Sequence, residues 1–338
     1  MGIEIRGLRE DEFEVHDRLV CEAYREFMSE REFLEETGWW LQNIEKDPYY
    51  RPEQTRVLLA DGEMVASVSN YRRETYCAGR RALIGAIGSV ATHPNHRRRG
   101  YVKQLLADSV EWMRRQSFDF SFLFGREEVY GGSGWRMFSA FNLVASVRPV
   151  QDDCGLTLRS ARFPEDIPAL SAIHDEFNAP LTGPFLRSEA YWRTRVARGY
   201  FRDNTRSFHL FEDDGRPVAY CRAEDPETIT ELGWLRSEPS LPSRTIGALL
   251  SHRRDAEQVR LGFHTHELIA ALDPYLWAPT QAAHGQRATV LRLVEVNRGM
   301  WRYIGPGAGN FGQVTDTESM LRFLRSNEYV FWGPVDNF

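Results

Sequence analysis

The segment "ATHPNHRRRG", residues 91–100, places three consecutive arginines directly before a glycine. Where a strand ends in a turn and a helix follows, the first N–H groups of the helix lack intrahelical partners and attract anions. Gly100 allows the backbone to approach a ligand closely. Arg97, Arg98 and Arg99 can donate charge-assisted hydrogen bonds to phosphate. The segment therefore predicts a binding site for a diphosphate.

A solvated basic corner and a nucleic-acid patch are the competing interpretations of this turn. Cations at a helix N-terminus oppose the helix dipole and gain nothing without an anion, which counts against a bare corner. The chain has 42 Lys and Arg against 48 Asp and Glu, a net charge of −6, which argues against a general nucleic-acid binder. The spacing matches neither GxxxxGK[ST] nor GxGxxG, so the fingerprints of a P-loop and of a dinucleotide site are missing.

The elements around the turn are predicted from the period of their apolar residues. "ALIGAIGSVAT", residues 82–92, is a continuous apolar strand that suits a central position in a sheet. From residue 101 the apolar residues recur at spacings of three and four, which predicts an amphipathic helix. "FDFSFLFG", residues 118–125, is the next strand. This strand–helix–strand order predicts a βαβ unit with parallel strands.

The length of 338 residues suggests about two domains. The polar linker at 148–155 divides two stretches of similar plan. Each begins with a strand and a helix, and each contains a hairpin with an Asp-Gly turn, at Asp61-Gly62 and Asp214-Gly215. We infer an internal structural repeat, in which the second copy lacks the basic turn.

A third segment begins near residue 288. "TVLRLVEVNRGMWRYI" predicts a strand that runs into a short helix, and residues 317–326 predict a helix capped by Thr317. The predicted domains are therefore 1–150, 151–285 and a short C-terminal segment, 286–338.

The arginine turn resembles the cofactor motif of a known family. Val90-x-Thr92-x-Pro94-x-x-Arg97-x-x-Gly100 is similar to the acetyl-CoA motif of the GCN5-related N-acetyltransferases (GNAT), V-x-V/T-x-P-x-x-R/Q-x-x-G-x-G/A. Val102 stands where the family usually has Gly or Ala. That departure and the wording "HRRRG" are similar to the enhanced-intracellular-survival (Eis) branch.

The resemblance implies a fold and a cofactor. The expected fold class is α+β, with tandem GNAT folds, each a mixed central sheet flanked by helices, and a short sterol-carrier-like C-terminal segment. The second fold is expected to be degenerate, which leaves one active site per chain. The residues expected to bind acetyl-CoA are Val90, Ala91, Thr92, Arg97, Arg98, Arg99, Gly100, Tyr101 and Val102.

Acetyl transfer to an amine needs a proton donor for the departing thiolate, and no enzyme nucleophile. Tyr130-x-x-x-Gly134-Trp135 resembles the family's Y-x-x-x-G-F/Y motif, whose tyrosine is that general acid. A core or turn aromatic is the alternative reading of Tyr130. Glu127 and Glu128 are candidate bases. In Eis-type enzymes the terminal carboxylate serves as the base, which implies the same role for Phe338.

The segment "EREFLEETGWWLQN" could attract a cationic amine through its glutamates, with Trp39 and Trp40 as a cation–π wall. For any single residue, a charged helix face or a core tryptophan is the more frequent outcome. His93 and His96 flank the turn and could contact phosphate or cap it. No histidine or cysteine spacing indicates a metal site.

The remaining features concern location and assembly. Four widely spaced cysteines indicate thiols in a reducing cytosol, and no apolar run is long enough for a membrane span. We therefore expect a cytoplasmic protein that binds no nucleic acid or membrane, with possible homo-oligomers. The leading function is an acetyl-CoA-dependent N-acetyltransferase acting on a primary amine. The alternative is a non-catalytic acyl-CoA-binding sensor module of the same fold.

Overall fold

The computed structural model describes residues 2–27, 38–151, 154–198, 205–223, 228–253, 257–276 and 291–330. The strands in these ranges are β1 (Ile3–Gly7), β2 (Thr55–Ala60), β3 (Glu63–Cys77), β4 (Arg80–Thr92), β5 (Phe120–Leu123), β6 (Arg136–Ser146), β7 (Thr157–Ser160), β8 (Thr182–Phe185), β9 (Phe208–Asp213), β10 (Arg216–Ala223), β11 (Thr228–Trp234), β12 (Gln258–Leu261) and β13 (Leu291–Tyr303). The helices are α1 (Phe13–Tyr24), α3 (Trp39–Glu45), α4 (Tyr101–Arg115), α5 (Glu127–Tyr130), α6 (Ile167–Asn178), α7 (Glu189–Tyr191), α8 (Leu241–Ser251), α9 (His266–Leu272) and α10 (Thr317–Ser326).

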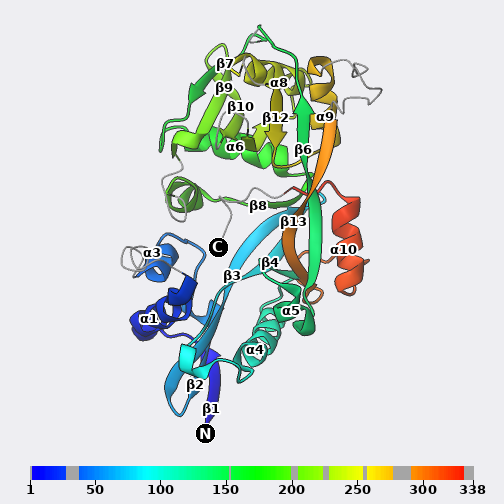
Figure 1. Ribbon diagram of the computed structural model, residues 1–338. Coiled ribbons are helices and arrows are strands. Elements are labelled where there is room, and N and C mark those ends of the chain that lie inside the picture. Colours follow the sequence, from blue (N-terminus) through cyan, green and yellow to red (C-terminus); the bar gives the residue numbers. More distant parts are fainter. Residues whose placement is uncertain are drawn as a thin grey trace.

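The strands form one mixed sheet in the order β1-β2-β3-β4-β5-β13-β6-β12-β11-β10-β9-β7, with β8 paired to β3. The pairs β4–β5 and β11–β12 are parallel, and the other pairs along this path are antiparallel. The sheet extends through both the lower and the upper part of the molecule in Figure 1, joined by the long strands β6 and β13. The expected α+β class, with a mixed sheet flanked by helices, is confirmed.

The two ends of the sheet follow the same plan. A hairpin with its turn at Asp61-Gly62 joins β2 to β3, and one at Asp214-Gly215 joins β9 to β10, with positive φ at all four residues. Each half then places a helix between two parallel strands, α4 between β4 and β5 and α8 between β11 and β12. This similarity between the two halves is the internal repeat that the sequence predicts. The division into three domains stays a prediction, because the sheet continues across both boundaries.

Strand β13 differs from its prediction. Residues 291–303 are extended throughout, so the short helix predicted at its end is wrong. The strand lies between β5 and β6 and pairs antiparallel with both. A register irregularity between Asn297 and Met300, with Gly299 at φ +84°, lets the strand bend and continue. Long-range pairing on both edges therefore overrides the local pattern.

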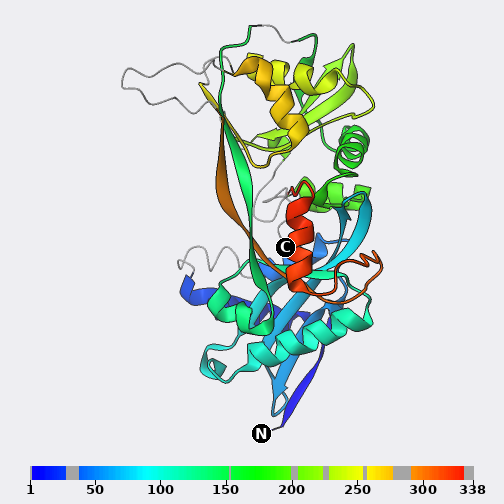
Figure 2. The same cartoon turned by 90° about the vertical axis from the view of Figure 1, so that its right-hand side faces the viewer.

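Helices cover both faces of the lower half of the sheet. Alternation along β2 sends Val57 and Leu59 to a core shared with α1 and α3, and Leu58 and Ala60 to a core shared with α4. Figure 2 shows α4 along one face, below α10. Helix α4, which directly follows the arginine turn, is thereby held against the sheet.

The C-terminal helix α10 packs on the centre of the sheet, where Met320, Leu321 and Leu324 join a core that includes Trp301 of β13. Its cap differs from the prediction. Asp316, not Thr317, is the N-cap, and its carboxylate accepts a hydrogen bond of 2.7 Å from the N–H of Ser319. The sterol-carrier-like character of this segment stays a prediction.

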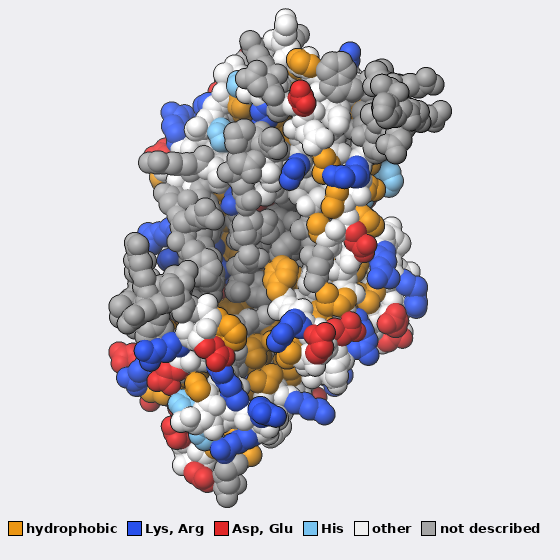
Figure 3. Space-filling model, viewed as in Figure 1, with side chains coloured by type: hydrophobic (Ala, Val, Ile, Leu, Met, Phe, Trp, Pro, Cys, Tyr) orange, Lys and Arg blue, Asp and Glu red, His pale blue; other side chains and the backbone are white. Residues whose placement is uncertain are grey.

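The surface gives no simple charge signal. On the face drawn in Figure 3, acidic and basic side chains both occur over the whole length of the molecule. Within the described residues, no helix is long and apolar enough to cross a membrane. The distribution of charge on this face therefore does not indicate a binding site.

His16 of α1 is fully buried, and its Nε2 atom lies 2.9 Å from Ser67 Oγ. Burial lowers its pKa to about 3, whereas a histidine in the unfolded chain titrates near 6.5. The unfolded state therefore binds the extra proton between these values. The contribution of neutral His16 to the free energy of unfolding is fully present above about pH 6.5 and is lost as the pH falls towards 3.

We expect His16→Gln to flatten the pH dependence of stability. In the wild type, the free energy of unfolding should fall by up to about 1.4 kcal/mol per pH unit below pH 6 because of this group. Urea unfolding between pH 4.5 and 7.5 measures the slope. Exposed His252, changed to Gln, is the control that keeps it. Equal slopes in wild type and His16→Gln would contradict the assignment.

Candidate active site

The pairing of the parallel strands β4 and β5 ends before the arginine turn begins. Their pairing stops at Ile87↔Leu123, where β5 ends, while β4 continues to Thr92. On its other edge β4 remains paired with β3 through an irregularity opposite Ser89, whose φ is +46°. Residues 88–92 therefore border a gap beyond β5, in which the described strands leave one edge of β4 without a partner. This edge can bind a ligand through backbone groups.

The predicted strand–turn–helix junction is present. Residues 94–96 form a short 3-10 turn, Arg98 has φ +64°, and Gly100 has φ +75° directly before α4. A left-handed φ favours glycine at position 100, although a side chain there would meet open space. The first N–H groups of a helix carry the positive end of its dipole, and α4 begins at Tyr101, directly after Gly100.

The arginine side chains divide into two groups. Arg97 donates hydrogen bonds to Glu26 (2.6 Å) and to the carbonyl of Ala23 (2.9 Å), so it ties the turn to the end of α1. Arg98 and Arg99 are exposed, and Arg99 reaches the carbonyl of Asn95 at 3.3 Å. His93 lies 3.3 Å from Glu22 and accepts from the N–H of Asn95, and it caps the turn.

The other residues predicted to bind the cofactor are placed by the core. Val90 and Val102 pack, partly buried, against the cluster that includes Leu105 and Trp135. Ala91 and Tyr101 are almost completely buried, with 1% and 3% exposed. Their backbones border the site, whereas their side chains belong to the core.

Tyr130 packs against the same cluster as Val90 and Val102. It is the last residue of α5, and its ring lies so close to Gly125 that a Cβ there would approach Tyr130 Cε2 to 2.4 Å. Burial raises its pKa above the ordinary value of 10, and nearby Arg126 opposes the rise only in part. The phenol therefore keeps its proton at neutral pH.

Two further tyrosines surround the end of β4, and sequence reasoning missed both. Tyr24 donates a 3.0 Å hydrogen bond to the carbonyl of Val90, and the Tyr71 hydroxyl lies 2.9 Å from Ser89 Oγ. Burial, together with the neighbouring Tyr130 and Tyr71, raises the pKa of Tyr24 to about 12. Neither belongs to a motif, so only the folded chain reveals them.

Several candidates do not join this group. Trp40 is fully buried against Phe13, His16 and Tyr50, so it is a core residue and not a wall for a ligand. Glu127 and Glu128 are exposed beside Tyr130. Phe338, the glutamates within 28–37 and the side chain of Trp39 lie outside the described residues.

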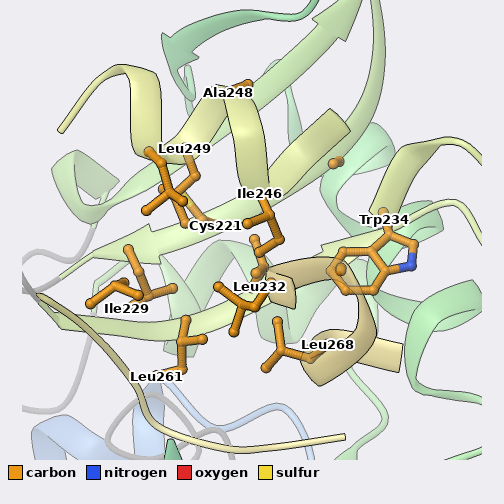
Figure 4. Packing of buried hydrophobic residues seen from close by; sticks show 14 of the residues in the cluster. Cys221, Ile229, Leu232, Trp234, Ile246, Ala248, Leu249, Leu261 and Leu268 are labelled. Carbon is orange, nitrogen blue, oxygen red and sulfur yellow. The ribbon is translucent and has the colours of Figure 1, made fainter. Parts of the chain in front are cut away.

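The equivalent junction of the second half is filled by its own side chains. β11 and β12 pair only at Thr228↔Arg260 and Ile229↔Leu261. Leu232 of β11, Leu261 of β12 and Leu268 of α9 lie together (Figure 4) and belong to the same hydrophobic core. Arg236 and the Trp234 indole both bond to Glu267. One active site per chain stays a prediction.

A comparison with protein families bears on this geometry. Residues 4–138 match the model of the acetyltransferase (GNAT) domain. The match begins in β1 and ends in β6, so it includes the gap, the arginine turn and Tyr130. No curated protein sequence matches the chain.

Solved structures share the GNAT fold along most of the chain. A GCN5-related N-acetyltransferase from Anabaena variabilis aligns with a TM-score of 0.61 at 13% identity, over 90% of this chain and 73% of that one. A probable N-acyltransferase from Enterococcus faecalis gives 0.65 at 14%, over 90% and 73%. Eis1 from Mycobacterium abscessus gives 0.58 at 15%, over 90% and 74%. At these identities the likeness shows the fold alone.

Proposed function

We propose that the chain is an acetyl-CoA-dependent N-acetyltransferase that transfers an acetyl group to a primary amine. The observation that carries the proposal is the convergence of the β4–β5 gap, the open α4 N-terminus and a protonated Tyr130 on one core cluster. The family match over residues 4–138 supports it. The Eis-like tandem organisation and a cytoplasmic location remain part of the proposal.

The cofactor is placed by its chemistry. The diphosphate of acetyl-CoA binds at the N-terminus of α4, where backbone N–H groups, Arg98 and Arg99 offer positive charge. Residues 90–92 of β4, which border the gap, would hold the acetylated arm. Among the residues predicted to bind the cofactor, Tyr101 and Ala91 contribute backbone only, because their side chains are buried.

The transfer is a direct attack. The amine nitrogen forms a bond to the thioester carbonyl carbon, the C–S bond breaks, and the thiolate takes the Tyr130 hydroxyl proton. The amine proton leaves to a base. In this proposal the base is the terminal carboxylate of Phe338, as the resemblance implies. Its ordinary pKa near 3.5 must rise through burial for that role.

A thiol-release assay tests the function. Full-length protein, acetyl-CoA and a panel of polyamines, aminoglycosides and lysine peptides should release free coenzyme A with at least one acceptor. Tight binding of acetyl-CoA without release on any acceptor would overturn the enzyme and favour the acyl-CoA-binding module.

Arg97→Ala should weaken acetyl-CoA binding about tenfold, because the loss of its hydrogen bonds to Glu26 and Ala23 releases the turn that positions Arg98 and Arg99. Titration calorimetry measures the affinity. Arg115→Ala, at the far end of α4, where the guanidinium forms an exposed ion pair with Glu111, is the matched control. Equal affinities for wild type and Arg97→Ala would count against the diphosphate site at the N-terminus of α4.

Gly125→Ala should lower kcat, because the added Cβ would come within 2.4 Å of the Tyr130 ring and displace it. A displacement near 1 Å at the reacting atoms costs on the order of 10²-fold in rate. Gly132→Ala, in the same loop, adds a methyl group with no neighbour within 4 Å and should keep the wild-type rate. If Gly125→Ala and Gly132→Ala have the same kcat, displacement of the Tyr130 ring does not slow the reaction.

A further inference from the structure

The loop that carries Tyr130 rests on a strand from the far end of the chain. It connects β5, which ends at Leu123, to β6, which begins at Arg136. These strands do not pair with each other in the sheet, because β13 lies between them. Met300 pairs with Leu123 on one side and with Met137 on the other. Both ends of the loop are therefore positioned by residues near 300.

Arg302 of β13 makes the side-chain contacts to this loop. Its guanidinium donates a hydrogen bond to the carbonyl of Ser133 and lies 5.0 Å from the centre of the Trp135 ring. Gly134 has φ +90°, and a Cβ there would lie 3.0 Å from Arg302 Nη1. The glycine in the Tyr130 motif therefore leaves the space that Arg302 occupies.

Trp135 connects this contact to the strands of the gap. The indole is fully buried, and its N–H donates to Ser121 Oγ at 3.2 Å. Ser121 in turn donates to the carbonyl of Gly85 in β4 at 2.8 Å. A cation–π contact from Arg302 to Trp135, followed by two hydrogen bonds through Ser121 to Gly85, thus connects β13 with β5 and β4.

The positive charge of Arg302 is suited to the carbonyl end of a helical turn. Residues 127–133 form two short helical turns, and the Gly131 carbonyl in the second accepts a hydrogen bond of 3.0 Å from the N–H of Gly134. Arg136 donates to the carbonyl of Gly131 at 2.7 Å, and Arg302 donates to that of Ser133. Burial and nearby Arg114 lower the pKa of Arg302 from its ordinary value, and arginine still keeps its charge there.

We propose that Arg302 is a positioning residue for the reaction, which holds the Tyr130 loop in place from the C-terminal strand. The inference rests on the proposed function and extends it, because it makes residues 291–304 part of the acetyltransferase site. A planar guanidinium both stacks on Trp135 and reaches a carbonyl, whereas a lysine ammonium offers only a point charge.

The first test uses Arg302→Gln and Arg302→Lys in the full chain. Both should lower kcat about 10-fold or more, with the KM for acetyl-CoA within about twofold of the wild type, because loop position and not cofactor binding is lost. Arg292→Gln is the matched control, an exposed arginine on the same strand. A wild-type kcat in both Arg302 variants would overturn the proposal.

A double variant separates positioning from general loss of structure. If Arg302 acts through Tyr130, then Arg302→Gln combined with Tyr130→Phe should have the kcat of Tyr130→Phe alone. Multiplicative losses would show that Arg302 acts elsewhere, and would overturn the role. Should Arg302→Gln fail to fold, Arg302→Lys carries the same cycle.

A readout without turnover keeps this inference distinct from the proposed function. In protein labelled with fluorotyrosine, the ¹⁹F resonance of Tyr130 is identified as the one that Tyr130→Phe removes. It should shift or broaden in Arg302→Gln and stay unchanged in Arg292→Gln. If wild-type protein releases no thiol, the proposed function fails. The resonance then decides the positioning role, since an unchanged signal overturns it and a shift supports it.

Discussion

Tyr130→Phe will lower kcat by about 10²-fold, within the range that a positioned general acid contributes. The ring of phenylalanine keeps the packing against Gly125 and removes only the hydroxyl. The KM for acetyl-CoA should therefore stay within about twofold. Free-thiol release with a saturating amine measures both constants.

The pH dependence follows from the direction of the pKa shift. The proton donor is the neutral phenol, and burial raises its pKa above 10. Loss of activity from phenol ionisation must therefore begin above the pH at which an ordinary tyrosine titrates. We expect no alkaline limb from this group below about pH 10, and none at all in Tyr130→Phe.

Tyr24→Phe is the stringent comparison, because this second phenol lies in the same group of side chains. Its hydroxyl is engaged with the carbonyl of Val90, so its removal should cost less than tenfold in kcat. A larger loss in Tyr24→Phe than in Tyr130→Phe would reverse the assignment of the acid. A wild-type rate in Tyr130→Phe would remove the tyrosine from the mechanism.

The parts of this site that sequence predicted are those encoded locally. One continuous segment contains the apolar residues 82–92, Gly100 and the amphipathic stretch after it. The residue pattern of each part determines its own backbone conformation. The Asp-Gly turns at 61–62 and 214–215 follow the same logic, because positive φ is a property of those residues. The strand–turn–helix junction could therefore be read directly.

The rest depends on pairing between distant residues. Nothing local in "TVLRLVEVNRGMWRYI" shows that Met300 pairs with both Leu123 and Met137, so the sequence predicts a strand that runs into a short helix. Arg302 and Tyr24 belong to no motif, and their roles come from contacts across the sheet. Trp40 next to glutamates suggested a binding wall, whereas the core of α1 and α3 encloses it.

The ion pair between Arg187 and Glu231 will have the largest effect on stability. Both side chains are completely buried and are joined by two hydrogen bonds of 3.0 Å. The Tyr220 hydroxyl donates to the same carboxylate, and the guanidinium lies 4.9 Å from the Trp192 ring. Removing one partner takes two buried charge-assisted hydrogen bonds from the other, which costs about 3–5 kcal/mol.

The position of this pair explains why the loss should spread through the molecule. Arg187 follows β8, which pairs with β3 of the first half, and Glu231 lies in β11 of the second half. Arg187→Met and Glu231→Leu should each lower the free energy of unfolding by this amount in urea titrations. Glu189→Gln, which breaks the exposed pair with Arg193, should change it by less than about 1 kcal/mol.

The double variant Arg187→Met with Glu231→Leu decides whether an unpaired charge is the cause. With both charges gone, an apolar pair of similar volume should recover most of the stability that either single change removes. If the double variant is as unstable as the sum of the two single variants, then packing, and not charge, explains the losses. If either single change costs less than 1 kcal/mol, the pair does not hold the halves together.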